Sequence, residues 1–248
     1  PFLGGGALFF SKPASYNEVV NDIEDRLITF YRTLKLWPQV LIDRVEATLY
    51  SESEKNTALQ IWKDPKAYTD VDIAWSVFCS TQMGAFSRPD ARMAEDPFTS
   101  KPRTFNKKKD LLKKAAARLQ NVIVCNRDAL KVIQSFDAPG VFFYIDPPYI
   151  GTSCVHYPAY SEQDFLNLLD LLQTVKGSFM LSCFDTPALQ EYTSRNSWFS
   201  LALKKPSKLK TFSKIKTDKD KNDTYETKYK VEMVTTNYDT NKVRGLFL

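Results

Sequence analysis

The chain has almost no histidine and little cysteine, which limits the chemistry open to it. His156 is the only histidine among 248 residues, and the four cysteines include no CxxC pair. Because zinc sites and thiol redox motifs are built from closely spaced histidines and cysteines, the sequence argues against a metal site and for a reducing compartment. No apolar run approaches the roughly 20 residues of a membrane span, so we expect a cytoplasmic protein with no membrane contact.

Glycine is also scarce, with eight residues in all, yet three of them stand together at Gly4–Gly6. Such a cluster lets the backbone turn tightly and approach a ligand closely, and a helix after it would offer free N–H groups. In a nucleotide-binding fold this loop would follow a first strand, but only Pro1 and Phe2 precede it, so we expect that an N-terminal segment is absent. No Lys-Ser or Lys-Thr follows the glycines, which argues against a P-loop.

The most informative stretch is Val141–Tyr149, which reads VFFYIDPPY. Its apolar run Val141–Ile145 predicts a strand buried on both faces, as in the middle of a parallel sheet. Proline cannot donate to a strand ladder, so Pro147 and Pro148 end the strand and leave Asp146 at its carboxyl edge, where open α/β sheets bind ligands. A rigid turn after an Asp-Pro is the plain alternative, but the full tetrapeptide favours a functional site.

A second acid follows an expected strand near the start of the chain. Residues 17–23 predict a strand that ends near Asp22, sixteen residues after Gly6. Rossmann-like sites place an acid about 20 residues after the glycine loop, where it binds ribose hydroxyls. The alternative is an N-cap for the helix that we expect over residues 24–36.

The rest of the pattern alternates strands with helices around a helical middle. Ser161, with Asp164 three residues later, predicts a helix N-terminus. We expect helices over 40–62, 71–81, 110–119, 129–135, 162–175 and 187–193, strands over 122–125 and 178–183, a loop over 88–109, and antiparallel strands over 198–203 and 229–236.

The net charge of +5 is unevenly distributed. Residues 101–118 hold eight basic residues and one acid, and residues 204–230 hold ten lysines and four acids, which leaves the rest of the chain net negative. Two basic segments on an acidic body favour a polyanionic partner. Solvated lysine-rich faces are the alternative.

The glycine loop, Asp22, the NRD that ends at Asp128 and the DPPY at Asp146 occur in an order that resembles the Dam-type (D12 class) DNA adenine-N6 methyltransferases. The resemblance covers most of the chain, from PFLGGG to TTNY. It implies an α/β, Rossmann-like S-adenosylmethionine-dependent methyltransferase fold with a mostly helical inserted target-recognition region, encoded by a bacterium or phage. The catalytic domain would comprise residues 1–35 and 119–248, and the insertion residues 36–118.

The resemblance also implies a role for each motif. Asp22 would bind the ribose hydroxyls of the cofactor, and Asp128 the exocyclic amine of its adenine. Asp146 and the carbonyl of Pro147 would accept hydrogen bonds from the target amine, and Tyr149 would stack on the flipped base. S-adenosylmethionine would be held by Pro1, Phe2, Gly4, Gly5, Gly6, Asp22, Asp128 and Asp146, and the catalytic set would be Asp146, Pro147, Pro148 and Tyr149.

These residue types suit the reaction. An adenine amine is a poor nucleophile because its lone pair is delocalised into the ring, and two acceptors stabilise the positive charge that develops on the nitrogen. The target base must leave the duplex, and stacking on Tyr149 offsets part of that cost. Double-stranded DNA would be contacted by Gln82, Arg88, Arg92, Lys101, Arg103, Lys107, Lys108, Lys109, Lys208 and Lys210, with Gln82, Arg88 and Arg92 as candidate base readers.

Three other readings remain open at this point. An RNA adenine-N6 methyltransferase would share the same catalytic edge, and a cytosine-N4 enzyme would need similar acceptors. A non-catalytic nucleic-acid-binding subunit of a methyltransferase complex would keep the fold and need a partner to complete the N-terminal edge. We otherwise expect a monomer.

Overall fold

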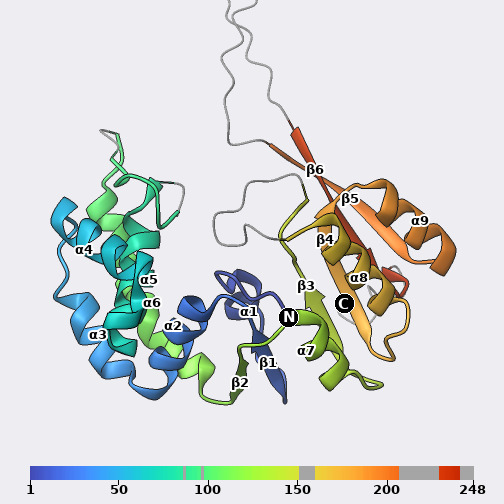
Figure 1. The fold of residues 1–248 in the computed structure, drawn as a ribbon, viewed down its shortest axis with the longest axis horizontal. Coiled ribbons are helices and arrows are strands. Elements are labelled where there is room, and N and C mark those ends of the chain that lie inside the picture. Colours follow the sequence, from blue (N-terminus) through green and yellow to red (C-terminus); the bar gives the residue numbers. More distant parts are fainter. Residues whose placement is uncertain (86–87, 96–97, 151–159, 207–228, 241–248) are drawn as a thin grey trace, which may run out of the picture. The chain divides into compact units, whose positions relative to one another are not determined.

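The computed structural model describes residues 1–85, 88–95, 98–150, 160–206 and 229–240 (Figure 1). The chain forms two compact units. The N-terminal unit holds Pro1–Ile133, and the C-terminal unit begins at Gln134. In the part of the chain that is described, no helix is long and apolar enough to cross a membrane.

A pair of parallel strands forms the sheet of the N-terminal unit. β1 (Glu18–Asn21) pairs with β2 (Val122–Cys125), and the register places Glu18 opposite Val122 and Asn21 opposite Cys125. Both strands were expected from the sequence, β2 with the same bounds. Asp22 follows β1 directly, and the short helix α1 (Ala7–Ser11) follows the glycines. The two strands therefore end side by side.

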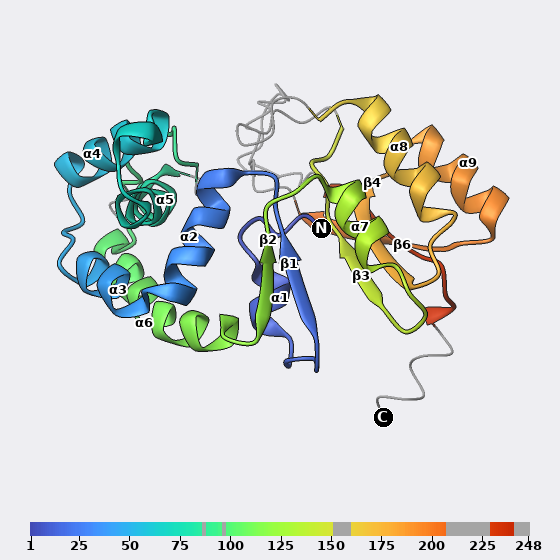
Figure 2. The same cartoon turned by 60° about the horizontal axis from the view of Figure 1, so that its bottom comes forward.

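A helical bundle makes up most of this unit (Figure 2). Side-chain caps mark where several helices begin: Ser51 accepts from the Glu54 N–H, and Thr69 forms a capping box with Asp72. Their apolar faces meet in one core, which includes Leu34, Leu41, Trp75, Phe78 and Phe105. The helices are α2 (Asp25–Leu36), α3 (Pro38–Glu46), α4 (Glu52–Lys63), the 3₁₀ turn η1 (Pro65–Ala67), α5 (Asp70–Met83) and α6 (Lys101–Leu119).

The prediction of a loop over residues 88–109 is wrong for the second half of that range, because α6 begins at Lys101. The Ser100 hydroxyl accepts from the Arg103 N–H and so caps the helix. Pro102 lies in the first turn, where its missing N–H costs no helical hydrogen bond. Phe105, one turn further on, is 2% exposed and fixes the helix to the core.

The C-terminal unit contains a mixed four-stranded sheet of order β3-β4-β6-β5. β3 (Phe142–Ile145) and β4 (Ser178–Phe184) are parallel, whereas β6 (Tyr229–Thr236) is antiparallel to both β4 and β5 (Phe199–Pro206). α7 (Ala129–Phe136) precedes β3, and α8 (Glu162–Leu172) and α9 (Pro187–Asn196) pack beside each other (Figure 2). Ser161 and Asp164 form the expected capping box.

The expectation that β3 is buried on both faces is wrong. Phe143 and Ile145 are buried, but Phe142 is 53% exposed and Tyr144 is half-buried. The strand therefore alternates, as strands do when one side of the sheet is more open than the other. Asp146 still follows the last strand residue, as the proline pair predicts.

Candidate active site

The glycine loop has a backbone conformation that needs glycine. Gly4 has a φ of 50° and Gly6 a φ of 64°, both in the left-handed region. A Cβ atom on Gly6 would also come within 2.8 Å of the Phe10 ring and 3.2 Å of the Tyr31 hydroxyl. The loop is closed by hydrogen bonds: the Tyr31 hydroxyl donates to the Gly4 carbonyl (2.9 Å), and the Gly6 N–H to the Leu3 carbonyl (2.9 Å).

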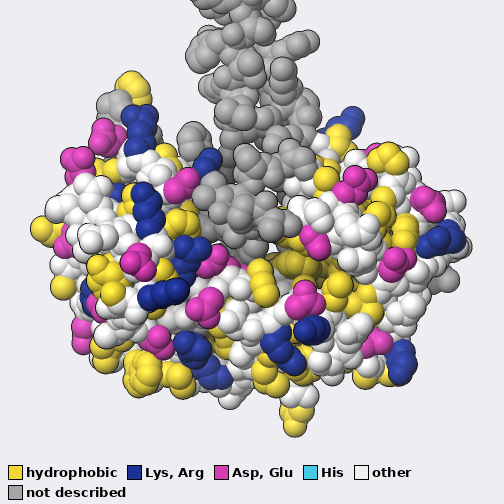
Figure 3. Space-filling view, in the orientation of Figure 1, with side chains coloured by type: hydrophobic (Ala, Val, Ile, Leu, Met, Phe, Trp, Pro, Cys, Tyr) yellow, Lys and Arg dark blue, Asp and Glu magenta, His cyan; other side chains and the backbone are white. Residues whose placement is uncertain are grey.

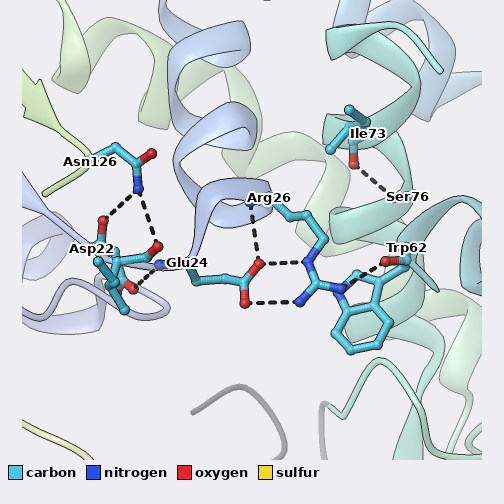
Figure 4. Close-up of polar contacts among 8 residues, drawn as sticks. Asp22, Glu24, Arg26, Trp62, Ile73, Ser76 and Asn126 are labelled. Carbon is cyan, nitrogen blue, oxygen red and sulfur yellow. Dashed lines mark hydrogen bonds and ion pairs between the residues drawn. The ribbon is translucent and has the colours of Figure 1, made fainter. Parts of the chain in front are cut away.

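Asp22 connects this loop to the start of α2, and Figure 4 shows its contact with Glu24. Its side chain is buried, with 1% exposure. Oδ2 accepts from the Gly4 N–H (2.8 Å), and Oδ1 accepts from the Glu24 N–H (3.0 Å). The N-cap of α2 is Glu24, whose side chain accepts from the Arg26 N–H. The N-cap alternative for Asp22 is therefore wrong, and its carboxylate instead holds the glycine loop against the turn after β1.

Two asparagines join the ends of β1 and β2, and neither was assigned a role from the sequence. Asn21 Nδ2 donates to the carbonyls of Pro1 (2.8 Å) and Arg127 (2.9 Å), and its Oδ1 accepts from the Arg127 N–H (3.0 Å). Asn126 Nδ2 donates to the carbonyls of Asp22 (2.9 Å) and Ile23 (3.3 Å). The sequence signal that could have indicated this role is the position of each asparagine: Asn21 ends one apolar strand, and Asn126 directly follows the other.

Asp128 lies at the same end of the strand pair, directly after Arg127. Its Oδ1 accepts from the Lys131 N–H at 3.0 Å, as a cap does at the start of a helix, here α7. The side chain is exposed, in contrast to the buried Asp22. Gly4–Gly6, Asp22 and Asp128 thus belong to one unit and surround the ends of β1 and β2.

The DPPY tetrapeptide lies in the C-terminal unit, at the carboxyl end of β3. Asp146 is exposed, and the Tyr144 hydroxyl is 3.5 Å from its Oδ2. Pro147 is buried and Pro148 half-buried, which fixes the direction in which the chain leaves the strand. The carboxylate is therefore presented at the strand end by a rigid turn.

Tyr149 is held from two sides. Its hydroxyl shares a hydrogen bond with Ser182 Oγ (2.9 Å), and its ring meets that of Phe184 edge to face, with centroids 4.6 Å apart. Ser182 and Phe184 both lie on β4, which pairs with β3 in parallel. Sequence reasoning missed both residues, because their proximity depends on the strand pairing.

Burial and nearby acids keep the two tyrosines protonated. Burial is the largest cause that raises the pKa of Tyr144, to about 12, and the charge of Asp146 adds to it. Burial likewise raises the pKa of Tyr149, with further contributions from Asp146 and Glu232. Both hydroxyls therefore stay protonated well above neutral pH and act as neutral hydrogen-bonding groups.

The predicted nucleic-acid residues differ in their surroundings. Arg88 pairs with Asp90 (3.0 Å), and Gln82 is half-buried on α5. Lys109 donates to the carbonyls of Glu46 (3.2 Å) and Thr48 (2.7 Å), so its ammonium group satisfies the end of α3. Arg92, Arg103, Lys107 and Lys108 are exposed, Lys101 is half-buried, and Lys208 and Lys210 lie outside the described residues.

A surface groove runs along part of α6. On the face in Figure 3, Lys and Arg side chains of the helical bundle are interspersed with Asp and Glu. The groove shows the same mixture, since it is lined by Glu46, Arg103, Asn106, Lys107, Lys109 and Asp110. Among the residues whose positions are described, no group of three or more His, Cys, Asp or Glu side chains could hold a metal ion.

Comparison with known proteins agrees with the motif order. A family model described as D12 class N6 adenine-specific DNA methyltransferase matches residues 1–203. The type II methyltransferase M1.LlaDCHI of Lactococcus lactis subsp. cremoris is 26% identical over 215 aligned residues, which cover 77% of this chain and 73% of that protein. The range 1–203 that the family model covers spans the glycine loop, Asp22, Asp128 and the DPPY tetrapeptide.

Proposed function

Because the chain belongs to the D12 class of N6 adenine-specific DNA methyltransferases, we propose that its two groups of site residues bind the methyl donor and the target base. Methylation of DNA adenine at N6 is the activity of the chain. Family membership therefore favours DNA over RNA as the substrate and adenine over cytosine as the target base. It also favours an enzyme over a non-catalytic subunit. The observation that carries the proposal is the exposed Asp146 at the end of β3, with Tyr149 fixed beside it by Ser182 and Phe184.

The donor-binding residues are those around the ends of β1 and β2. Methyltransferases of this family generally use S-adenosylmethionine, which supplies a methyl group activated by a positively charged sulfur. The left-handed glycines and the buried acid fit such a molecule, since they let the backbone approach it and provide a carboxylate for hydroxyl groups. A carboxylate accepts up to about four hydrogen bonds, so the role of Asp22 in the loop is compatible with bonds to ribose hydroxyls.

The other donor-binding roles follow the family pattern. We assign Asp128 to the exocyclic amine of the donor's adenine, because its exposed carboxylate lies at the ends of β1 and β2. Pro1 and Phe2, both half-buried, would complete the wall beside the glycine loop. The same family pattern also assigns Asp146 to the donor.

The target-binding residues act on the amine of the flipped adenine. The Asp146 carboxylate and the Pro147 carbonyl accept its two N–H groups, which draws the lone pair out of conjugation and stabilises the charge formed on nitrogen. Pro148 keeps the acid and the tyrosine in a fixed relation. Tyr149 offers its ring to the base while Ser182 holds its hydroxyl. Positioning therefore supplies most of the catalysis, and no metal or strong base is needed.

We further propose that the strands form a Rossmann-like catalytic domain of residues 1–35 and 119–248, with residues 36–118 as the target-recognition region. Acids after β1, β2 and β3 support this arrangement, because such folds bind ligands at the carboxyl ends of parallel strands. The helices α3–α6 between α2 and β2 support the insertion. The match to a type II methyltransferase also supports a role as the modification enzyme of a restriction-modification system.

The glycine loop provides a test of donor binding. Replacing Gly6 with alanine places a Cβ against Phe10 at a positive φ, so we expect the affinity for S-adenosylmethionine to fall by about tenfold or more, since strained left-handed positions cost about 1–3 kcal/mol. The unaltered chain is the reference. Titration calorimetry measures both proteins, and an unchanged affinity in a folded Gly6→Ala variant would contradict this role of the loop.

The exposed lysines of α6 test the DNA contact. DNA affinity should fall steeply with salt, and the double change Lys107→Ala and Lys108→Ala should reduce the slope of log K against log salt by up to about 2, since each phosphate contact contributes about 0.9. Lys66→Ala is the control, an exposed lysine outside the basic segments. Fluorescence anisotropy with a duplex at several salt concentrations measures the slopes. An unchanged slope in the double variant would remove these lysines from the interface.

A further inference from the structure

Arg26 lies in the first turn of α2 and binds three groups at once (Figure 4). Its Nε and Nη2 donate to the two carboxylate oxygens of Glu24, at 2.5 and 2.9 Å. Its Nη1 donates to the Trp62 carbonyl at 2.8 Å, and the guanidinium lies over the Trp62 ring, 4.0 Å from the centroid. One arginine therefore joins the start of α2 to the last turn of α4.

Direct hydrogen bonds continue from this cluster to the glycine loop. The Glu24 N–H donates to Asp22 Oδ1, and Asp22 Oδ2 accepts from the Gly4 N–H. The Glu24 side chain also caps the Arg26 N–H, so the carboxylate and the backbone of Glu24 are fixed together. The position of the Asp22 carboxylate thus depends on a turn whose far side is clamped by Arg26.

We infer that Arg26 is a positioning residue for the methyl donor, which anchors the Asp22–Glu24 turn to Trp62 in the helical region. The inference rests on the proposed donor-binding role of Asp22 and Gly4–Gly6. In this role Arg26 acts on the donor through Asp22, and its contact with Trp62 makes donor binding depend on a residue of the proposed recognition region.

The geometry favours arginine over lysine at this position. A planar guanidinium pairs with both carboxylate oxygens and stacks on an indole ring at the same time, which an ammonium group does not. The side chains of Arg26 and Glu24 are 23% and 14% exposed. Arg32 on the same helix pairs with Asp70, but those side chains are 47% and 43% exposed, and surface pairs of that kind contribute little.

A purely structural role makes a different prediction. If Arg26 only stabilised the start of α2, its loss would lower the melting temperature but leave the donor affinity of the folded protein unchanged. If it positions Asp22, its loss raises the dissociation constant and the KM for S-adenosylmethionine, whereas the KM for DNA stays the same. The two roles therefore separate in the binding measurement.

The experiment compares Arg26→Ala, Arg26→Lys and Arg32→Ala in the full chain. Titration calorimetry should show a dissociation constant for S-adenosylmethionine raised about tenfold by Arg26→Ala, somewhat less by Arg26→Lys, and less than twofold by Arg32→Ala. An Arg26→Ala variant that melts cooperatively and binds the donor as tightly as the original chain would overturn the inference.

Changes at Trp62 keep the test decisive if Arg26→Ala fails to fold. Trp62→Phe keeps an aromatic face and the backbone carbonyl, so its affinity should stay close to that of the original chain. Trp62→Ala removes the stacking partner and should raise the dissociation constant about threefold. Equal affinities in these two variants would overturn the inference. No binding by the unaltered chain would instead overturn the proposed donor site, on which the inference depends.

Discussion

Replacing Asp146 with alanine is expected to lower kcat for methyl transfer by about 10²–10³-fold, the effect of removing one preorganised group that stabilises charge in the transition state. Asp146 is exposed at the end of β3, and the proline pair fixes its direction. In the proposed mechanism its carboxylate is one of two acceptors for the target amine, and its interaction strengthens most as positive charge develops there. The affinity for S-adenosylmethionine should change little, because most of the proposed donor contacts come from Gly4–Gly6, Asp22 and Asp128.

Tyr144→Phe is the matched control for this prediction. The Tyr144 hydroxyl is 3.5 Å from Asp146 Oδ2, a long contact that orients the carboxylate weakly. Its removal should lower kcat only a few-fold, by about the 0.5–1.5 kcal/mol that a typical hydrogen bond contributes. Transfer of a tritiated methyl group to DNA measures both variants. Undiminished transfer by Asp146→Ala would contradict the mechanism.

The second large effect is expected at Tyr149. Tyr149→Ala should lower kcat/KM for DNA by about 5–150-fold, because base stacking on an aromatic ring contributes about 1–3 kcal/mol. Tyr149→Phe keeps the ring and its edge-to-face contact with Phe184, and loses the hydroxyl group, which bonds to Ser182 and interacts with Asp146. Its effect should therefore be smaller, about a few-fold.

Ser182→Ala separates the ring from the hydroxyl. It removes the Ser182 hydrogen bond and leaves both the Tyr149 ring and the Tyr149 hydroxyl in place, so its activity should be at least that of Tyr149→Phe. Tyr149→Trp should retain more activity than Tyr149→Ala. If the alanine and phenylalanine variants lose the same activity, the hydroxyl and not the ring would be responsible, contrary to the stacking role.

Much of the fold follows from local sequence signals. β2 has the bounds that its apolar run predicts, and the capping box at Ser161 starts α8 as expected. β3 ends before Asp146 because prolines follow it. The start of α6 was missed because prolines and charges suggested a loop, while Pro102 in fact occupies a first turn. A proline in the first turn of a helix is favourable, whereas a proline in the helix interior disrupts the helix.

The sequence predicts which residue types make up the site, but it does not predict which residues they contact. Asp22, Asp128 and Asp146 were each expected at a strand end, and each follows a strand there. Their partners depend on pairings distant in sequence: Asn21 bonds to Arg127, 106 positions away, and Tyr149 to Ser182, 33 positions away. Strand order and register decide such contacts, and a single sequence shows neither. Likewise, the sequence predicts only that Arg26 lies on a helix, because its contacts with Trp62 depend on how the helices pack.

The chain transfers a methyl group to the N6 amine of adenine in DNA, and the proposed mechanism makes Asp146 essential for the transfer. The most direct test incubates duplex DNA with S-adenosylmethionine carrying a deuterated methyl group, digests it to nucleosides and analyses them by mass spectrometry. The unaltered chain should yield deuterated N6-methyladenine, and Asp146→Ala almost none. Label on cytosine, or equal labelling of adenine by both proteins, would contradict the account.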